Sequence, residues 1–79
     1  METLYLSINM EKTGNKIKTL LKEQGITTEQ VKVACGFEYT QAIYKWYRGQ
    51  SLPSLENLII LSRILHTSIE SMLVVEVNG

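Results

Sequence analysis

The chain has 79 residues and a formal net charge of +0, with 44% hydrophobic and 20% charged residues, which indicates one small folded domain rather than a disordered chain. No apolar run reaches the ~20 residues of a membrane-spanning helix and no secretory leader is evident, so we expect a cytoplasmic protein without membrane contact. One cysteine, one histidine and no aspartate are too few for a disulfide framework or a structural zinc site, and we expect no metal, cofactor or small-molecule ligand.

At both chain ends, apolar residues alternate with polar or partly polar ones, as they do in short strands. A period of two between apolar and partly polar residues favours strands over helices, and two such strands could pair within one chain or between two chains. We treat residues 1–12 as an N-terminal extension, 13–74 as the domain and 75–79 as a C-terminal tail. The apolar residues of the extension belong either to the core or to a homodimer contact that involves the tail, and we favour the homodimer contact. The alternating residues are Leu4, Leu6, Ile8 and Met10 at one end and Leu73, Val75 and Val77 at the other.

A first helix is predicted from about Thr13 onward. Ile17, Leu20 and Leu21 recur at the i, i+3, i+4 spacing that places apolar side chains on one helical face. Gly25 follows this stripe and can adopt the left-handed conformation that ends many helices. We therefore expect the first helix to stop just before this glycine.

A short second helix is predicted from Thr27 to Gly36. Thr27 can cap it, and Gln30 stands at the spacing of a capping box. Val31 and Ala34 are expected to face the core. Because Gly36 ends the helix after barely two turns, a tight turn must follow.

The third predicted helix has two different faces. It begins at Tyr39 or Thr40 and closes at Gly49, with Ile43 and Trp46 on its apolar side. We expect Trp46 to belong to the core rather than to stack on a nucleic acid. The other side carries polar groups at i, i+3, i+4 and i+7, namely Gln41, Tyr44, Lys45 and Arg48.

Two more helices complete the predicted domain. Ser54 caps the fourth, which we expect to be nearly all core, and Thr67 or Ser68 caps the fifth. Five helices with short strands at the two ends make an all-α domain. The apolar residues of these last helices are Leu55, Leu58, Ile59, Leu61, Ile64 and Leu65, followed by Ile69, Met72 and Leu73.

Two short helices joined by a glycine turn, the second with a polar outer face, are typical of a helix-turn-helix DNA reader. The major groove admits one helix, and we expect residues of about 39–48 to enter it. The Gln41 amide can pair bidentately with adenine, and Lys45 can donate to guanine. The candidate base-reading residues are Thr40, Gln41, Tyr44 and Lys45.

Phosphate contacts are expected from helix N-termini and from donors beside the third helix. The charges support this placement, because residues 12–48 hold seven cations against three carboxylates, while both flanking segments are negative. The candidate phosphate-binding residues are Thr28, Arg48, Gln50 and Ser51, with Lys16 and Lys32 as longer-range candidates.

From Gly14 to Leu73 the chain resembles the lambda-repressor-like, or XRE (Cro/CI-type), helix-turn-helix regulators. The resemblance rests on an ordered set of residues rather than on one motif. It implies a five-helix domain that binds duplex DNA, often as a dimer, and regulates transcription in bacteria, phages or integrated elements. The matching residues are Ile17, Leu20, Gly25-Ile26-Thr27, Val31, Gly36-Phe37, Ile43, Trp46-Tyr47-Arg48-Gly49, Pro53, Leu58, Leu61, Leu65 and Ile69-Glu70-Ser71-Met72-Leu73.

The chain departs from the family pattern in two places. Many members pair an arginine in the first helix with a glutamate after the tryptophan, where this chain has Leu21 and Tyr47. We expect an apolar contact to replace that ion pair, because losing only one partner would be costly. The segment between Gly36 and Ile43 is also one residue longer than the commonest spacing, so base contacts could shift by one position.

The residues therefore predict a sequence-specific regulator that binds double-stranded DNA, acting as a repressor or as an activator. An enzyme is not expected, because no nucleophile with a base, paired carboxylates or phosphate loop can be assembled. The alternative is a protein-interaction module, such as an antitoxin-like partner or an adaptor, that keeps the fold without reading DNA. The neutral net charge and the two cations on the third helix favour that alternative slightly.

Overall fold

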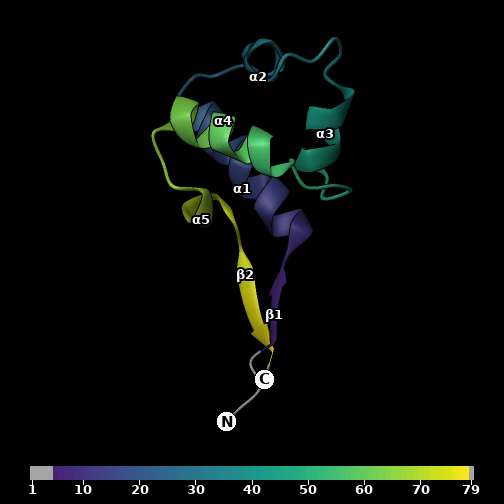
Figure 1. The fold of residues 1–79 in the computed structure, drawn as a ribbon, viewed down its shortest axis with the longest axis vertical. Coiled ribbons are helices and arrows are strands. Elements are labelled where there is room, and N and C mark those ends of the chain that lie inside the picture. The colour runs from purple at the N-terminus through teal and green to yellow at the C-terminus, as the bar shows by residue number, and fades with distance from the viewer. Residues whose placement is uncertain (1–4, 79) are drawn as a thin grey trace.

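The computed structural model describes residues 5–78 and shows five helices above a two-stranded ribbon (Figure 1). This confirms the all-α, five-helix fold and the short strands at its ends. None of the helices in this part of the chain is long and apolar enough to cross a membrane. The elements in chain order are β1 (Tyr5–Ile8), α1 (Met10–Glu23), α2 (Thr28–Cys35), α3 (Gln41–Tyr47), α4 (Leu55–Leu65), α5 (Ile69–Met72) and β2 (Val75–Asn78).

Helix α1 begins three residues earlier than predicted. Asn9 is its N-cap, and the Asn9 side chain accepts a hydrogen bond from the backbone N–H of Lys12 at 2.8 Å. Met10 is therefore the first helical residue and not the end of a strand, and the alternation stops at Ile8. The prediction was wrong here because the capping capacity of an asparagine overrides a weak period of two.

The other predicted helix boundaries follow their capping residues closely. Thr27 and Gln30 form the expected capping box, and Ser54 and Ser68 cap α4 and α5 through their side chains. Helix α3 begins at Gln41, slightly later than predicted, after a bend at residues 38–40. The three glycines predicted to follow helices, Gly25, Gly36 and Gly49, have φ between 70° and 74°.

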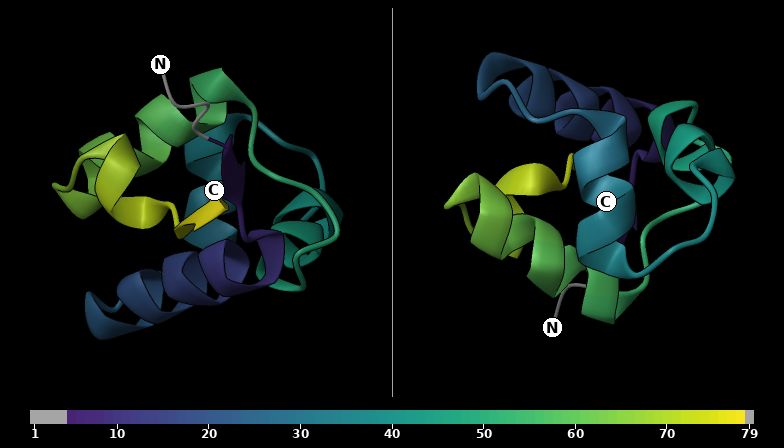
Figure 2. Two further views of the ribbon diagram at one scale, coloured as in Figure 1. Left: turned by 90° about the horizontal axis from the view of Figure 1, so that it is seen from below. Right: turned by 90° about the horizontal axis from the view of Figure 1, so that it is seen from above.

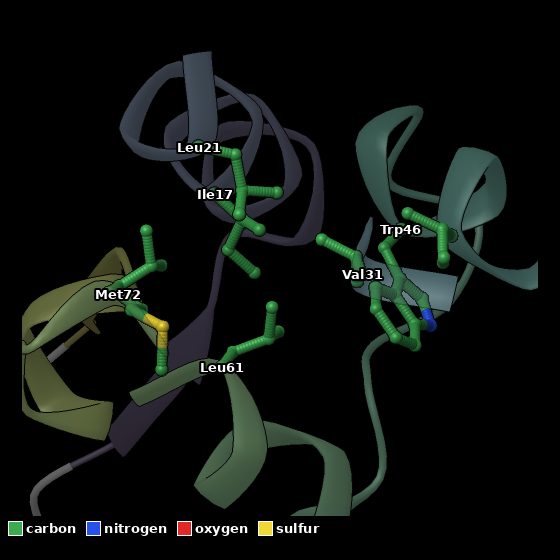
Figure 3. Packing of buried hydrophobic residues seen from close by; sticks show 8 residues of the cluster. Ile17, Leu21, Val31, Trp46, Leu61 and Met72 are labelled. Atoms are coloured by element: carbon green, nitrogen blue, oxygen red, sulfur yellow. The ribbon is translucent and has the colours of Figure 1, made fainter. Parts of the chain in front are cut away.

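The core lies where α1, α3, α4 and α5 converge with α2 (Figure 3). Trp46 is buried in it, as predicted, and its ring meets that of Phe37 edge to face at 5.8 Å. Eight buried hydrophobic residues form the cluster, and Thr13 is buried beside them. They are Ile17, Leu21, Val31, Ile43, Trp46, Leu61, Leu65 and Met72.

Two expectations about the core were wrong. Ala34 is exposed, and the inner face of α2 is formed by the buried Val31 and by the half-buried Cys35 one turn later. Helix α4 is not nearly all core, since Leu55 is 71% exposed and Ile59 is 44% exposed. A helix at the surface of a small domain buries only one stripe, which in α4 is centred on Leu61 and Leu65.

Helices α1 and α3 pack so closely that two glycines are required between them. A methyl group at Gly14 would lie 1.8 Å from the carbonyl oxygen of Trp46. A methyl group at Gly49, which also has φ +74°, would lie 2.6 Å from the Cα of Glu11. These contacts fix the position of α3 against the N-terminal half of α1.

The ribbon pairs within one chain and projects from the helices (Figure 1). Strands β1 and β2 are antiparallel, and the molecule measures 46 × 24 × 21 Å along its principal axes. Seen from below, the ribbon is nearly end-on, with α1 and α4 on opposite sides of it (Figure 2). The Asn9 N–H donates to the Val74 carbonyl at 2.8 Å and the Val74 N–H donates to the Thr13 hydroxyl at 2.9 Å, so the base of the ribbon is held to α1.

Candidate nucleic-acid interface

Helix α3 presents a polar outer face because its inner face is buried. Ile43 and Trp46, three residues apart, point into the core. The side chains on the opposite side must therefore face solvent. Four of them line one shallow surface hollow and include three of the candidate base readers: Gln41, Tyr44, Lys45 and Arg48.

Thr40, the fourth candidate base reader, lies at the start of this face. It is the N-cap of α3, but its hydroxyl makes no capping hydrogen bond. Gln41 and Lys45 are exposed, and Tyr44 is 43% exposed. Hydroxyl, amide, phenol and ammonium groups thus stand along one and a half turns of helix, which is the kind of surface that reads base edges.

The candidate phosphate donors after α3 lie next to this face. Arg48 lines the α3 hollow and also a second hollow together with Glu11, Lys12 and Asn15 of α1. Gln50 is exposed and Ser51 is half-buried, directly after the turn at Gly49. The structure thus places Arg48 on the outer face of α3, and Gln50 and Ser51 follow the C-terminal end of the helix.

Thr28 is at the first residue of α2, as predicted, but its hydroxyl already has a partner. The Thr28 Oγ1 and the Tyr47 hydroxyl are 3.1 Å apart and share a hydrogen bond. This bond joins the first turn of α2 to the last turn of α3. Thr28 can therefore offer its backbone N–H to an anion, while its side chain fixes the two helices relative to each other.

Burial raises the pKa of the Tyr47 phenol above its usual value, and the hydrogen bond shared with Thr28 opposes part of this effect. The nearby Tyr44 ring meets that of Tyr47 edge to face, with centroids 5.7 Å apart. Leu21 of α1 lines the same hollow as Tyr47. Leu21 and Tyr47 thus line one hollow, and a direct apolar contact between them in place of the family's ion pair stays a prediction.

The lysines of α1 that lie near α3 are not the one predicted from the sequence. Lys18 and Lys22 line a hollow with Thr28 and Tyr44, so they adjoin the outer face of α3. Lys16 is exposed on α1, but it stands two residues from Lys18, about 200° around a helix with 3.6 residues per turn. The helical phase relative to the buried Leu21 was the signal that could have selected Lys18 and Lys22.

Lys32 also differs from the other candidate phosphate contacts, because it is already paired. Its ammonium forms an ion pair with Glu29 one turn earlier in α2, at 2.5 Å. The pair lowers the positive charge that Lys32 can offer to a distant phosphate. Lys12, which shares a hollow with Arg48, is better placed than Lys32.

Within residues 5–78, no group of three or more histidine, cysteine or carboxylate side chains could hold a metal ion. Cys35 is half-buried at the end of α2, and burial raises the pKa of its thiol. A thiol that is kept protonated is a poor nucleophile.

The arrangement of α2, the glycine turn and α3 defines a helix-turn-helix domain. The helix-turn-helix family model matches residues 17–71, and the chain belongs to that family, in its XRE or lambda-repressor-like branch. This is a family of DNA-binding regulators. A comparison with curated proteins gave no match.

A solved structure has the same fold. The chain is similar to the BldD DNA-binding domain of S. venezulae with a TM-score of 0.66 and 15% sequence identity. The similar region covers 84% of this chain and 97% of that domain. At this identity the likeness establishes the arrangement of the helices and leaves the individual contact residues to be argued from this chain.

Proposed function

We propose that the protein binds double-stranded DNA at specific sequences, as a transcriptional regulator that inserts α3 into the major groove. The observation that carries the proposal is the outer face of α3, where Gln41, Tyr44, Lys45 and Arg48 share one surface hollow. A single helix fits the ~12 Å width of the major groove. Membership of the helix-turn-helix family supports the same proposal.

Base edges are read from the N-terminal and central part of α3. Gln41 pairs with an adenine through both atoms of its amide, and Lys45 donates to guanine O6 or N7. Thr40 and Tyr44 add hydroxyl contacts or apolar contacts with thymine methyl groups. These four residues determine which sequence is bound.

Phosphates are held on both sides of that helix. On one side, Arg48, Gln50 and Ser51 follow α3, and on the other side Thr28 opens α2. Helix N-termini and cationic side chains both attract phosphate oxygens. Lys16 and Lys32 contribute at longer range, and Lys12, Lys18 and Lys22 add positive charge closer to the outer face of α3.

A protein-interaction module is the second candidate function. The formal net charge of +0 favours it, because non-specific DNA binding rests on positive charge. In that case the α3 hollow would contact a protein partner and no duplex would be selected.

Selection of bound duplexes from a random DNA pool, followed by titration of the selected duplex across salt, tests the proposal. We expect a defined site to be enriched, with affinity falling as salt rises. The double variant Gln41→Ala/Lys45→Ala should lose the enrichment while keeping its fold by circular dichroism. If nothing is enriched at about 50 mM salt, where phosphate contacts are strong, DNA reading is rejected and the protein-interaction module stands.

A further inference from the structure

One carboxylate lies among the side chains that are proposed to bind phosphate. The hollow between the start of α1 and the end of α3 is lined by Glu11, Lys12, Asn15, Tyr47 and Arg48. Lys12 and Arg48 bring positive charge to this hollow, whereas Glu11 brings negative charge to the same place. The proposed DNA contacts give the Glu11 carboxylate no role.

The place of Glu11 beside the end of α3 is fixed by backbone packing. Glu11 is the second residue of α1, and a methyl group at Gly49 would lie 2.6 Å from its Cα. The first turn of α1 therefore lies directly against the turn that follows α3. Arg48 precedes Gly49, and Gln50 and Ser51 follow it. The backbone of Glu11 thus stays next to the candidate phosphate donors as long as α1 and α3 remain packed together.

The charge of Glu11 is not cancelled by a direct contact inside the protein. Glu11, Lys12 and Arg48 are all exposed, and within residues 5–78 no ion pair joins Glu11 to either cation. A carboxylate and a phosphate about 6 Å apart in water repel each other enough to lower an affinity about threefold. A phosphate bound at Arg48 would feel this repulsion.

We propose that the Glu11 carboxylate faces a backbone phosphate held by Arg48 and lowers the affinity of the protein for every duplex alike. The inference rests on the proposed function, because it needs α3 in the major groove with a phosphate beside Arg48. All sequences carry the same phosphates, so a carboxylate at this place weakens binding without changing which bases are preferred. The base contacts of α3 then supply a larger share of the binding free energy.

The test is Glu11→Gln, with Glu70→Gln as its matched control. Both residues are exposed carboxylates in the first turn of a helix, so both substitutions change the net charge by the same amount and remove the same favourable interaction with a helix dipole. Glu70 belongs to α5, which lies away from α3 (Figure 1, Figure 2). Each variant is titrated with the selected duplex and with an unrelated duplex of the same length, across a range of salt concentrations.

We expect Glu11→Gln to bind both duplexes about threefold more tightly than the wild type at about 50 mM salt. Glu70→Gln should leave both affinities nearly unchanged. The gain should vanish toward about 1 M salt, where the Debye length is about 3 Å. Glu11→Lys doubles the change in charge and should strengthen binding about tenfold at low salt. Glu11→Ala repeats the test should Glu11→Gln fail to fold, as judged by circular dichroism.

Equal effects of Glu11→Gln and Glu70→Gln, with a wild type that binds the selected duplex, would overturn the inference, because only the net charge would then matter. Weaker binding of Glu11→Gln to the selected duplex alone would overturn it too, since Glu11 would then accept a hydrogen bond from a base. A wild type that binds no duplex at low salt would reject the proposed function and this inference with it. The two failures are therefore distinguishable.

Discussion

Within α3, some residues stabilise the fold and others are available to contact DNA. Ile43 and Trp46 are buried, while Gln41, two positions before Ile43, and Lys45, one position before Trp46, are exposed. This alternation follows from the 3.6-residue period of the helix. Substitutions on the outer face should therefore change DNA binding with little effect on stability.

Gln41→Ala should relax sequence preference at one base position. The loss of a bidentate contact with adenine costs about 1–3 kcal/mol of discrimination at that position. Repeating the random-pool selection with the variant measures the change base by base. An unchanged preference profile would remove Gln41 from the base-reading set.

Arg48→Ala should weaken binding to all sequences alike. Removal of one phosphate contact lowers the slope of log affinity against log salt by about 0.9. The matched control is Arg63→Ala, which removes an arginine from the exposed side of α4. Titrations of the selected duplex at several salt concentrations compare the two, and equal slopes for both variants would argue against a phosphate contact at Arg48.

At the scale of elements, the contact between α1 and α3 controls how the outer face is presented. Gly14 allows the Trp46 carbonyl to approach α1 closely, and the chain turns at Gly49 against Glu11. Helix α3 has only seven residues and would be marginal in isolation. Its position and its helicity therefore depend on this packing.

Gly14→Ala should destabilise the protein, in contrast to the usual effect of alanine in a helix. At an open helical position the change would stabilise by about 0.5–1 kcal/mol. Here the added methyl group collides with backbone, so we expect a loss of about 1–3 kcal/mol or more. Urea unfolding measures it, with Thr19→Ala at an exposed position of the same helix as the control.

The hydrogen bond between Thr28 and Tyr47 links α2 to α3, and Tyr47→Phe removes it. We expect a loss of about 0.5–1.5 kcal/mol near neutral pH. Burial raises the pKa of Tyr47 in the folded state above its usual 10.0. Above pH 10 the unfolded state therefore loses its proton first, and the wild type loses stability relative to the variant.

Urea unfolding of the wild type and of Tyr47→Phe, from pH 7 to about pH 11, measures this difference across the ordinary tyrosine range. The stability advantage of the wild type should be full below pH 10 and shrink above it. Tyr39→Phe, at a position 68% exposed, is the matched control. A constant difference between the wild type and Tyr47→Phe would show that burial of the phenol does not affect its ionisation.

At the scale of the whole molecule, the charge balance conceals a local concentration of cations. The net charge is +0, yet Arg48 and Lys12 share one hollow and Lys18 and Lys22 share another. An affinity that depends on a few cations should be sensitive to salt and modest for one domain. Two copies bound to one duplex would double the number of contacts.

If two copies bind DNA as a dimer, the selected DNA should be an inverted repeat. Helix-turn-helix dimers bind half-sites about 10 base pairs apart, which is one helical turn. Insertion of about five base pairs between the half-sites turns one of them to the opposite side of the duplex and should abolish joint binding. Gel-shift titrations of the two spacings compare them, and equal affinity would indicate that each copy binds independently.

Most of the fold was predictable because its signals are local. The caps at Thr27, Ser54 and Ser68 and the glycine after α2 act within a few residues, so their sequence patterns place the helices correctly. The outer face of α3 was also predictable, because the helical period assigns it once Ile43 and Trp46 are placed inward. The start of α1 was missed because Asn9 was not weighed as a cap.

Local patterns along the chain are enough to predict the five helices, their order and the polar face of α3, since each depends on neighbours within one or two turns. The hydrogen bond between Thr28 and Tyr47 and the pairing of the two ends within one chain become known only from the folded molecule. These features join residues that are far apart in the sequence. Close packing between separate elements sets such contacts, and that packing leaves no periodic signal along the chain.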